Sequence, residues 1–182
     1  MLLLEVRTLD LGEDVQAVGL DLTAGDEEPA RGPEAAKVWA RVLRAVPGAE
    51  SWVADFFSHL PRVRDYCLRH AVEFRETPSS AIVVPAPPAD QLEGLCHRFE
   101  AETFGARCGA PLAPGDAELE RALLHRGLDA YHPVFGNYFF CAVCQFSDGS
   151  LVVLSRHLDA PEILRRTRAA LQGLGVEVFT PQ

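Results

Sequence analysis

The sequence predicts an α+β fold: one domain over residues 1–182, in which a largely antiparallel sheet from N- and C-terminal hairpins packs with about five helices. Paired β-branched and apolar runs flank short polar turns towards both ends of the chain, which is the pattern of β-hairpins. Between them, apolar residues recur with helical spacing. The 182 residues, 48% of them hydrophobic, suffice for one core. The predicted order is ββ-ααα-β-αα-ββ-α-β.

The first two predicted strands form an antiparallel hairpin. Leu2–Leu11 and Val15–Thr23 alternate apolar and polar residues around the turn Gly12–Asp14. Ala24–Gly32 follows and is acidic and rich in residues that break regular structure. Residues 24–32 are therefore predicted to form an acidic, mobile loop.

Three helices are predicted next. Pro33 opens the first and Pro47 and Gly48 end it, with an apolar face of Ala35, Trp39, Val42, Leu43 and Val46. Glu50–Phe74 keeps helical spacing with an interruption at Pro61, which predicts a kinked helix or two consecutive ones. The apolar stripe of this second segment comprises Val53, Phe56, Phe57, Leu60, Val63, Tyr66, Cys67, His70 and Phe74.

The middle of the chain is predicted as one strand and two helices. Ala81–Val84 is a short strand, and the prolines after it cannot pair at a sheet centre. Asp90 is expected to cap a helix that buries Leu92, Leu95, Cys96 and Phe99. Ala106–Gly115 is expected to be irregular. Asp116 is expected to cap a short helix that ends at Gly127.

The strongest hairpin signal lies in Tyr138–Arg156, where two apolar runs flank Asp148 and Gly149. A two-residue turn at Asp148-Gly149 would place Cys144 opposite Val153 and Cys141 opposite Arg156. Both faces of this hairpin are apolar near its middle, which predicts a position at the sheet centre with cover on both sides.

The last elements are a helix and a strand. Asp159 is expected to cap the helix, with Pro161 in its first turn and Glu162 completing a capping box. Gly175 would end this helix, and Val176–Phe179 would form the final strand. The buried face of the helix is predicted to comprise Ile163, Thr167, Ala170, Leu171 and Leu174.

Charge and composition exclude several classes of function. The net charge of −9 argues against a nucleic-acid surface, which needs clustered Lys or Arg. No apolar run reaches the roughly 18 residues of a membrane span. Met1–Leu4 lacks a basic region and a cleavage site, so we expect a cytoplasmic protein rather than a secreted one. The acidity would suit a basic protein partner, and it serves solubility equally well.

The chain has five cysteines, an odd number that favours buried thiols over disulfides. Cys141 and Cys144 have a C-x-x-C spacing. On one strand, residues three apart point to opposite faces and lie about 10 Å apart, too far to share a zinc ion or form a disulfide. We therefore predict that this pair belongs to the core.

Cys67 and His70 are the weak candidates for a metal site, because residues three apart share one face of a helix. Cys96 and Cys108 could complete four ligands, but no spacing requires it. A core cysteine and a hydrogen-bonded histidine would occupy the same stripe. We favour no metal ion and predict no cofactor.

The candidate catalytic residues are Cys141, Arg156, His132 and His157. In the predicted register Cys141 faces Arg156, whose guanidinium would lower the pKa of the thiol and create a nucleophile. The two histidines would lie near the same open end of the hairpin. Alternatively, Arg156 and His157 simply extend into solvent where the strand ends.

Three functions follow, and whether the protein is an enzyme is left open. The favoured one is a non-catalytic protein-binding accessory or immunity-type module of a cytoplasmic system, suggested by the small acidic domain and the acidic segment Gly25–Glu28. The second is a small enzyme or ligand-binding protein with a Cys/Arg/His pocket at the end of the central hairpin. The third is a structural zinc protein. Nucleotide-binding, zinc-protease and serine-hydrolase motifs are absent from the sequence, and its oligomeric state is left open.

Overall fold

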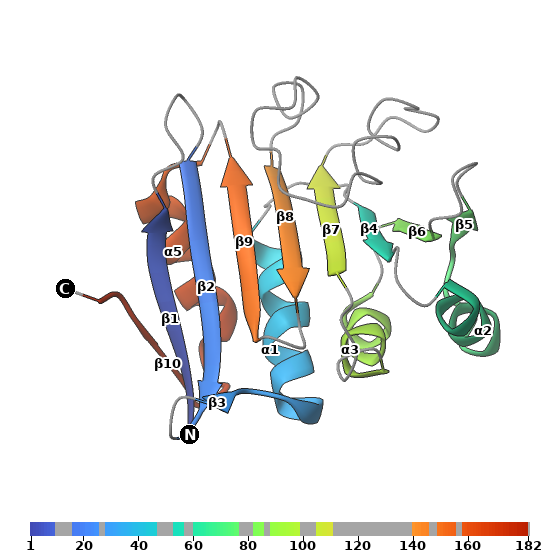
Figure 1. Cartoon of the computed structure of the whole chain (residues 1–182), viewed down its shortest axis with the longest axis horizontal. Helices are drawn as coiled ribbons and strands as arrows, with labels where there is room; N and C mark the ends of the chain where they lie inside the picture. Colours follow the sequence, from blue (N-terminus) through green and yellow to red (C-terminus); the bar gives the residue numbers. More distant parts are fainter. Residues whose placement is uncertain are drawn as a thin grey trace.

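One sheet of ten strands runs through the described part of the chain (Figure 1). The computed structural model describes residues 1–9, 16–25, 28–46, 53–56, 60–76, 82–85, 88–98, 105–110, 140–145, 149–155 and 158–181. The strands are β1 (Leu2–Leu9), β2 (Gln16–Ala24), β3 (Glu28–Pro29), β4 (Val53–Phe56), β5 (Arg75–Glu76), β6 (Ile82–Pro85), β7 (Gly105–Ala110), β8 (Phe140–Gln145), β9 (Ser150–Ser155) and β10 (Val176–Phe179).

The strand order is β10-β1-β2-β9-β8-β7-β4-β6-β5, and β3 pairs with β2 beside this path. All these pairs are antiparallel except β1 with β10, which is parallel. The α+β class and the largely antiparallel sheet are thereby confirmed. The central position predicted for the Tyr138–Arg156 hairpin is confirmed as well, because β9 and β8 stand in the middle of the order.

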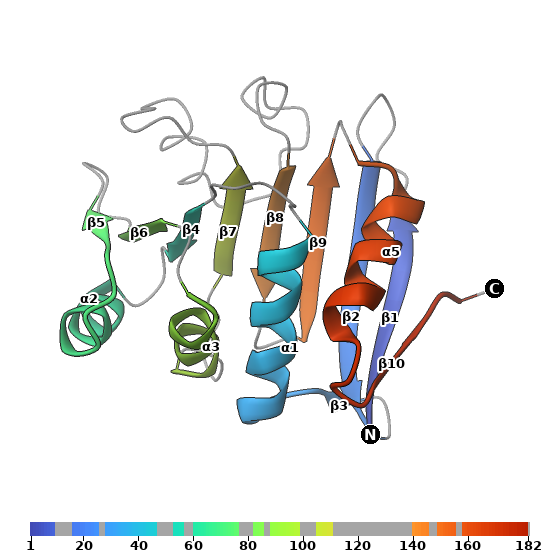
Figure 2. The ribbon, with the colours of Figure 1, turned by 180° about the vertical axis from the view of Figure 1, so that it is seen from behind.

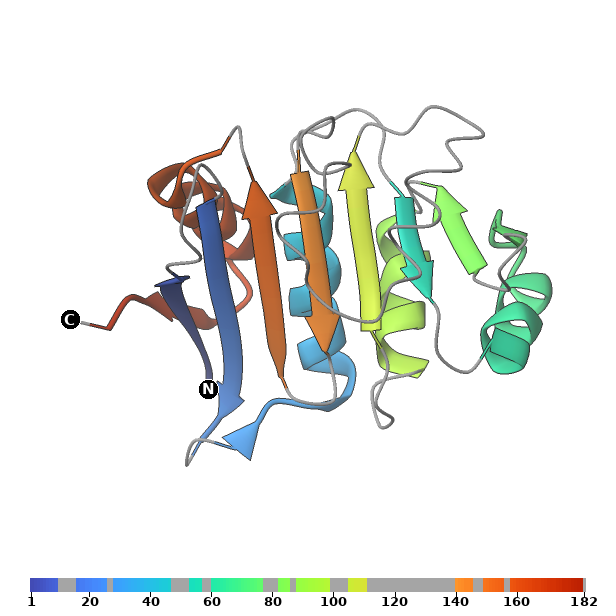
Figure 3. The same cartoon turned by 45° about the horizontal axis from the view of Figure 1, so that its top comes forward.

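Three helices cover one face of this sheet. They are α1 (Gly32–Ala45), α3 (Ala89–Arg98) and α5 (Ala160–Leu171), seen behind the sheet in Figures 1 and 3 and in front of it in Figure 2. The fourth described helix, α2 (Leu60–Arg69), lies at the end of the sheet that carries β5. The helix predicted to start at Asp116 lies outside the described residues, and no described helix is long and apolar enough to cross a membrane.

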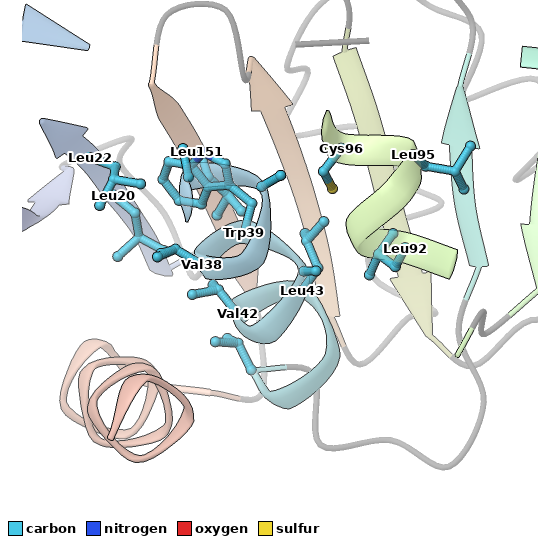
Figure 4. Packing of buried hydrophobic residues seen from close by; sticks show 14 of the residues in the cluster. Leu20, Leu22, Val38, Trp39, Val42, Leu43, Leu92, Leu95, Cys96 and Leu151 are labelled. Carbon is cyan, nitrogen blue, oxygen red and sulfur yellow. The ribbon is translucent and has the colours of Figure 1, made fainter. Parts of the chain in front are cut away.

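The core fills the space between the sheet and these helices. Alternate residues of β1, β2 and β9 point to the helices and are buried, namely Leu4, Val6, Val18, Leu20, Leu22, Leu151 and Val153. Figure 4 shows Trp39 and Leu43 of α1 among the labelled core residues, with Leu92, Leu95 and Cys96 of α3 beside them. The apolar face predicted for α1 is confirmed, since Ala35, Trp39, Val42, Leu43 and Val46 are all buried.

The register of the central hairpin differs from the prediction. Gln145 pairs with Ser150, which leaves four residues between the last paired positions instead of two. Cys144 therefore lies opposite Leu151 rather than Val153, and Cys141 lies opposite Leu154 rather than Arg156. A shift of two residues keeps the predicted alternation in step between the two strands but changes each cross-strand partner.

The contacts of Gly149 fix the start of β9 against β2 and β3. Its backbone has a φ of 66°, and its carbonyl oxygen accepts a hydrogen bond of 2.7 Å from the amide of Leu22 in β2. A Cβ at this position would stand 2.7 Å from the Leu22 oxygen and 3.2 Å from the Cβ of Pro29. Only glycine combines this conformation with so close an approach. Gly149 is thus fixed against β2 and β3, which the sequence around the turn does not reveal.

Strands β4 and β7 form where the sequence predicted a helix and an irregular segment, respectively. The helix predicted to start at Glu50 is wrong over Val53–Phe56, because these residues form β4 between β6 and β7. The spacing of Val53 and Phe56 favours a helix, but four residues are too few for periodicity to exclude a strand. Ala106–Gly115, expected to be irregular, begins with β7. Its glycines and alanines have little β propensity, so neighbouring strands decide its conformation.

The predicted acidic loop at 24–32 is only partly a loop. Glu28 and Pro29 pair with Ala24 and Thr23 of β2, and the Ala30 amide donates to the Leu22 oxygen over 2.9 Å. Gly32 already belongs to α1. The mobility expected for this segment stays a prediction.

The cap predicted for α5 is confirmed, and the one predicted for α3 is wrong. Asp159 accepts a hydrogen bond of 2.8 Å from the Glu162 amide through Oδ1. Asp90 lies inside the first turn of α3, because that helix begins at Ala89 and the Leu92 amide donates to the oxygen of Pro88. At Asp90 the carboxylate favours the helix through the dipole of its N-terminus.

The last strand of the sheet pairs with the first strand of the chain. After α5 a turn leads to β10, which has the predicted bounds and pairs with β1 from Leu2–Val176 to Glu5–Phe179. Arg166 of α5 donates to the Val46 carbonyl at the end of α1 over 3.0 Å. The sheet edge and this contact therefore join the last elements to the first.

Candidate functional site

The structure does not bring the predicted catalytic residues together as a cross-strand pair. Arg156, His132 and His157 lie outside the described residues, and Cys141 in β8 has Leu154 and Gly109 as its Cα partners. The expected opposition of Cys141 and Arg156 is wrong. The wider pocket around these four residues stays a prediction.

The two cysteines of the C-x-x-C spacing occupy different rows of the sheet. Cys144 is the Cα partner of Leu151, whose side chain is 1% exposed under the helices. Cys141 is three positions away on the same strand, with Gly109 and Leu154 as its Cα partners. The prediction that one strand runs through both cysteines is confirmed, and the absence of a shared metal ion stays a prediction.

The metal candidates on α2 differ sharply in exposure. Cys67 is fully buried and burial raises the pKa of its thiol to about 11, so the neutral form dominates at neutral pH. His70 follows the helix, is exposed, and its ring lies 4.2 Å from that of Tyr66. Within the described ranges no three metal-binding side chains gather. Cys96 of α3 is buried too, as predicted for a core cysteine.

A shallow acidic cleft lies between α3 and the start of α1. Asp90, Glu93 and His97, spaced along one face of α3, line it together with Pro33 and Gly94, and its volume is about 240 Å³. Sequence reasoning treated Asp90 as a cap and therefore missed this face. Charged side chains are common on helical faces that contact solvent. The carboxylates of this cleft therefore do not by themselves indicate a binding or catalytic site.

The second described cleft borders the edge strand β10. Its volume is about 250 Å³, and it is formed by the last turn of α5, the turn after it and one face of β10. Leu171 is 2% exposed, and Val176 and Val178 are half-buried. Gly173 and Gly175 have positive φ angles, and a Cβ on either would meet nothing within 4 Å. We call this cleft the β10 groove.

The charges around the β10 groove differ between the two faces of the strand. Arg168 lines the groove itself. On the opposite face, Glu177 is exposed and has no ion-pair partner among the described residues. Neighbouring Glu5 is held by Arg7, with 3.3 Å between Oε1 and Nε, and Arg7 also pairs with Asp21. Glu177 is therefore the available charge on the edge strand.

The edge of β10 is available for pairing over the described residues. Among the described strands β10 is outermost and pairs only with β1, along one of its two edges. Figures 1 and 2 show it at the end of the sheet, with the described chain beyond it leading away to the C-terminus. No family model matches the sequence, and neither a curated protein nor a solved structure matches the chain.

Proposed function

We propose that the protein is a non-catalytic, protein-binding accessory or immunity-type module, and that it binds its partner through β10. The observation that carries this proposal is the outermost strand β10, which has an edge that no other described strand pairs with and lies beside a groove that Leu171, Val176 and Val178 line in part. A free edge presents a row of unpaired N–H and C=O groups, which an extended segment of another protein can use as a template.

Binding of this kind would draw its affinity and its selectivity from different groups of β10. Main-chain hydrogen bonds to β10 would hold the incoming strand, and the β10 groove would receive every second side chain of it. Val176 and Val178 form one wall of that groove and are half-buried already. Neither the thiol pocket nor the structural zinc site gains comparable support from the described residues.

The test is co-purification from extracts of the source cells with four versions of the full chain. Val178→Lys places on β10 the residue with which natural proteins block edge strands, and Gln172→Trp fills the groove from an exposed position. Ala169→Lys adds the same charge to an exposed position of α5 and serves as the control. We expect a stoichiometric partner with wild type and A169K, and its loss with V178K and Q172W.

Thermal unfolding of all four proteins shows that the variants are folded. A partner that V178K and Q172W both retain overturns β10 as the binding site. Wild-type protein that recovers no stoichiometric partner overturns the binding function itself.

A further inference from the structure

We infer that the segment bound by β10 is an extended strand in which apolar side chains alternate with Lys or Arg, the apolar ones entering the β10 groove. This inference rests on the proposed function and adds the chemistry of the partner. It follows from the difference between the two faces of β10.

The groove face of β10 selects apolar side chains. Leu171 lies buried at the groove, and Val176 and Val178 line it, so water leaves apolar surface when an aliphatic side chain enters. The bare backbone at Gly173 and Gly175 leaves room for such side chains. Arg168 stands on the same side and repels a basic residue there. Basic residues of the partner are therefore confined to the other face.

The opposite face of β10 carries Glu177 and the exposed Phe179, and at Glu177 it favours a basic side chain. Glu177 is exposed between the two half-buried valines and has no ion-pair partner among the described residues. Residues directly opposite each other on neighbouring strands stand close enough for charges to interact, and opposite charges stabilise the pair. The net charge of −9 adds a long-range attraction for a basic segment.

The same charges disfavour a second copy of this chain as the occupant. Pairing β10 with β10 of another copy would bring a second Glu177 to the same edge, together with another net charge of −9. Like charges across a strand pair destabilise it. A basic strand from a different protein fits the edge better.

Fluorescence anisotropy with labelled heptapeptides tests the inference on the full-length protein. One peptide alternates Lys and Val, and its counterpart carries Glu in place of Lys. We expect the Lys peptide to bind wild type on the order of fivefold more tightly, with a preference that weakens as salt is added. Glu177→Lys should reverse this preference, whereas Glu73→Lys makes the same charge change at an exposed position after α2 and should preserve it.

N-methylated Lys peptides identify the strand pairing itself. Methyl groups on the amides of the Val residues block one edge of the peptide, and methyl groups on those of the Lys residues block the other. Only one edge of the bound strand faces β10, so one methylated peptide should bind and the other should fail. Equal binding, or equal failure, of the two peptides overturns pairing with β10.

Two further outcomes overturn the inference. One is a Glu peptide that binds wild type as tightly as the Lys peptide. The other is a wild-type dimer in sedimentation that V178K dissociates, because a second copy would then occupy the edge. If capture of the cellular partner still depends on Val178 and Gln172, only the partner's chemistry is refuted. If that dependence is absent too, the proposed function fails.

Discussion

At the scale of single residues, Gly94 shows how a neighbour can reverse a local preference. Gly94 lies inside α3, where alanine would stabilise an isolated helix by about 1 kcal/mol. The hydroxyl of Tyr66, on α2, occupies the space that a Cβ would take, and Tyr66 Cζ would lie only 3.1 Å from that Cβ. Tyr66 is 8% exposed and so cannot turn away without losing its packing.

We expect Gly94→Ala to lower the free energy of unfolding by about 1–2 kcal/mol, because overpacking costs more than helix propensity returns. Urea denaturation measures the change. In a Tyr66→Phe background the same substitution should cost less, since the overlapping hydroxyl is gone. A G94A protein more stable than wild type would show that α2 does not pack on α3 in this way.

The buried cysteines could be predicted from spacing alone. Cys67 and Cys96 fall on the apolar stripes of their helices, and both are buried. His70 fits the same stripe in sequence but is exposed, because α2 ends at Arg69 and the chain turns. Helical periodicity predicts burial only for residues inside the helix. The predicted core position of His70, which follows the last residue of α2, was therefore wrong.

At the scale of elements, the residue that ends α2 has a strained backbone, which a substitution could relieve. Ala71 has a φ of 52°, the left-handed conformation that suits glycine. The Val72 amide donates to the Cys67 oxygen over 2.9 Å, the long backward bond that closes a helix in this geometry. Val72 is 4% exposed and fixes the chain in this turn.

We expect Ala71→Gly to raise the free energy of unfolding by about 0.5–1 kcal/mol, although alanine-to-glycine changes usually destabilise. Ala169→Gly, at an exposed position inside α5, is the matched control and should lower it by a similar amount. Chemical denaturation of the two variants beside wild type compares them. A loss of stability in A71G would contradict the left-handed turn.

In the central hairpin, some features could be predicted from the sequence of the two strands, and others depend on the rest of the sheet. Alternation predicted which residues of β8 and β9 share a face, and the pairing of Ala142 with Val153 and Cys144 with Leu151 agrees with it. The cross-strand partners were not predictable. The start of β9 is likewise fixed by the contact of Gly149 with β2 and β3, which lie far away in sequence.

At the scale of the whole molecule, α5 joins the end of the chain to α1. Glu162 accepts hydrogen bonds from Arg165 at 2.6 and 2.7 Å and from Arg166 at 2.7 Å. The same Arg166 reaches the carbonyl of Val46. These bonds, first those of Arg165 and then that of Arg166, lower the pKa of Glu162 to about 2 from its ordinary 4.5.

A carboxyl group whose pKa is lowered by folding stabilises the protein above its ordinary pKa and loses that effect as the pH falls through the folded value. We therefore expect Glu162 to contribute stability above about pH 4.5, and to lose it progressively towards pH 2. Unfolding free energies at pH 6 and pH 3 should differ less in Glu162→Gln than in wild type. Glu34→Gln, in the first turn of α1, serves as the control.

A carbon-13 NMR titration of the Glu162 carboxyl measures the pKa directly. A midpoint at its ordinary value would mean that the arginines do not hold this side chain in solution. Because Arg165 is exposed and Glu162 is partly exposed, added salt should weaken the effect.

By itself, the sequence determined the α+β class, the buried face of α1, the N-terminal hairpin, the bounds of β10 and, of the predicted buried face of α5, Ile163, Thr167 and Leu171 but not the half-buried Ala170 and Leu174. These features depend on residues that are near one another in the chain, where spacing, caps and turn residues report the conformation directly. The tertiary structure alone decided that Val53–Phe56 is a strand, which register β8 and β9 adopt, and that β10 closes on β1 in parallel. Such pairings join distant segments and depend on packing and backbone contacts that no local pattern encodes. The candidate binding site belongs to this second group, because an edge is free only in relation to the rest of the sheet.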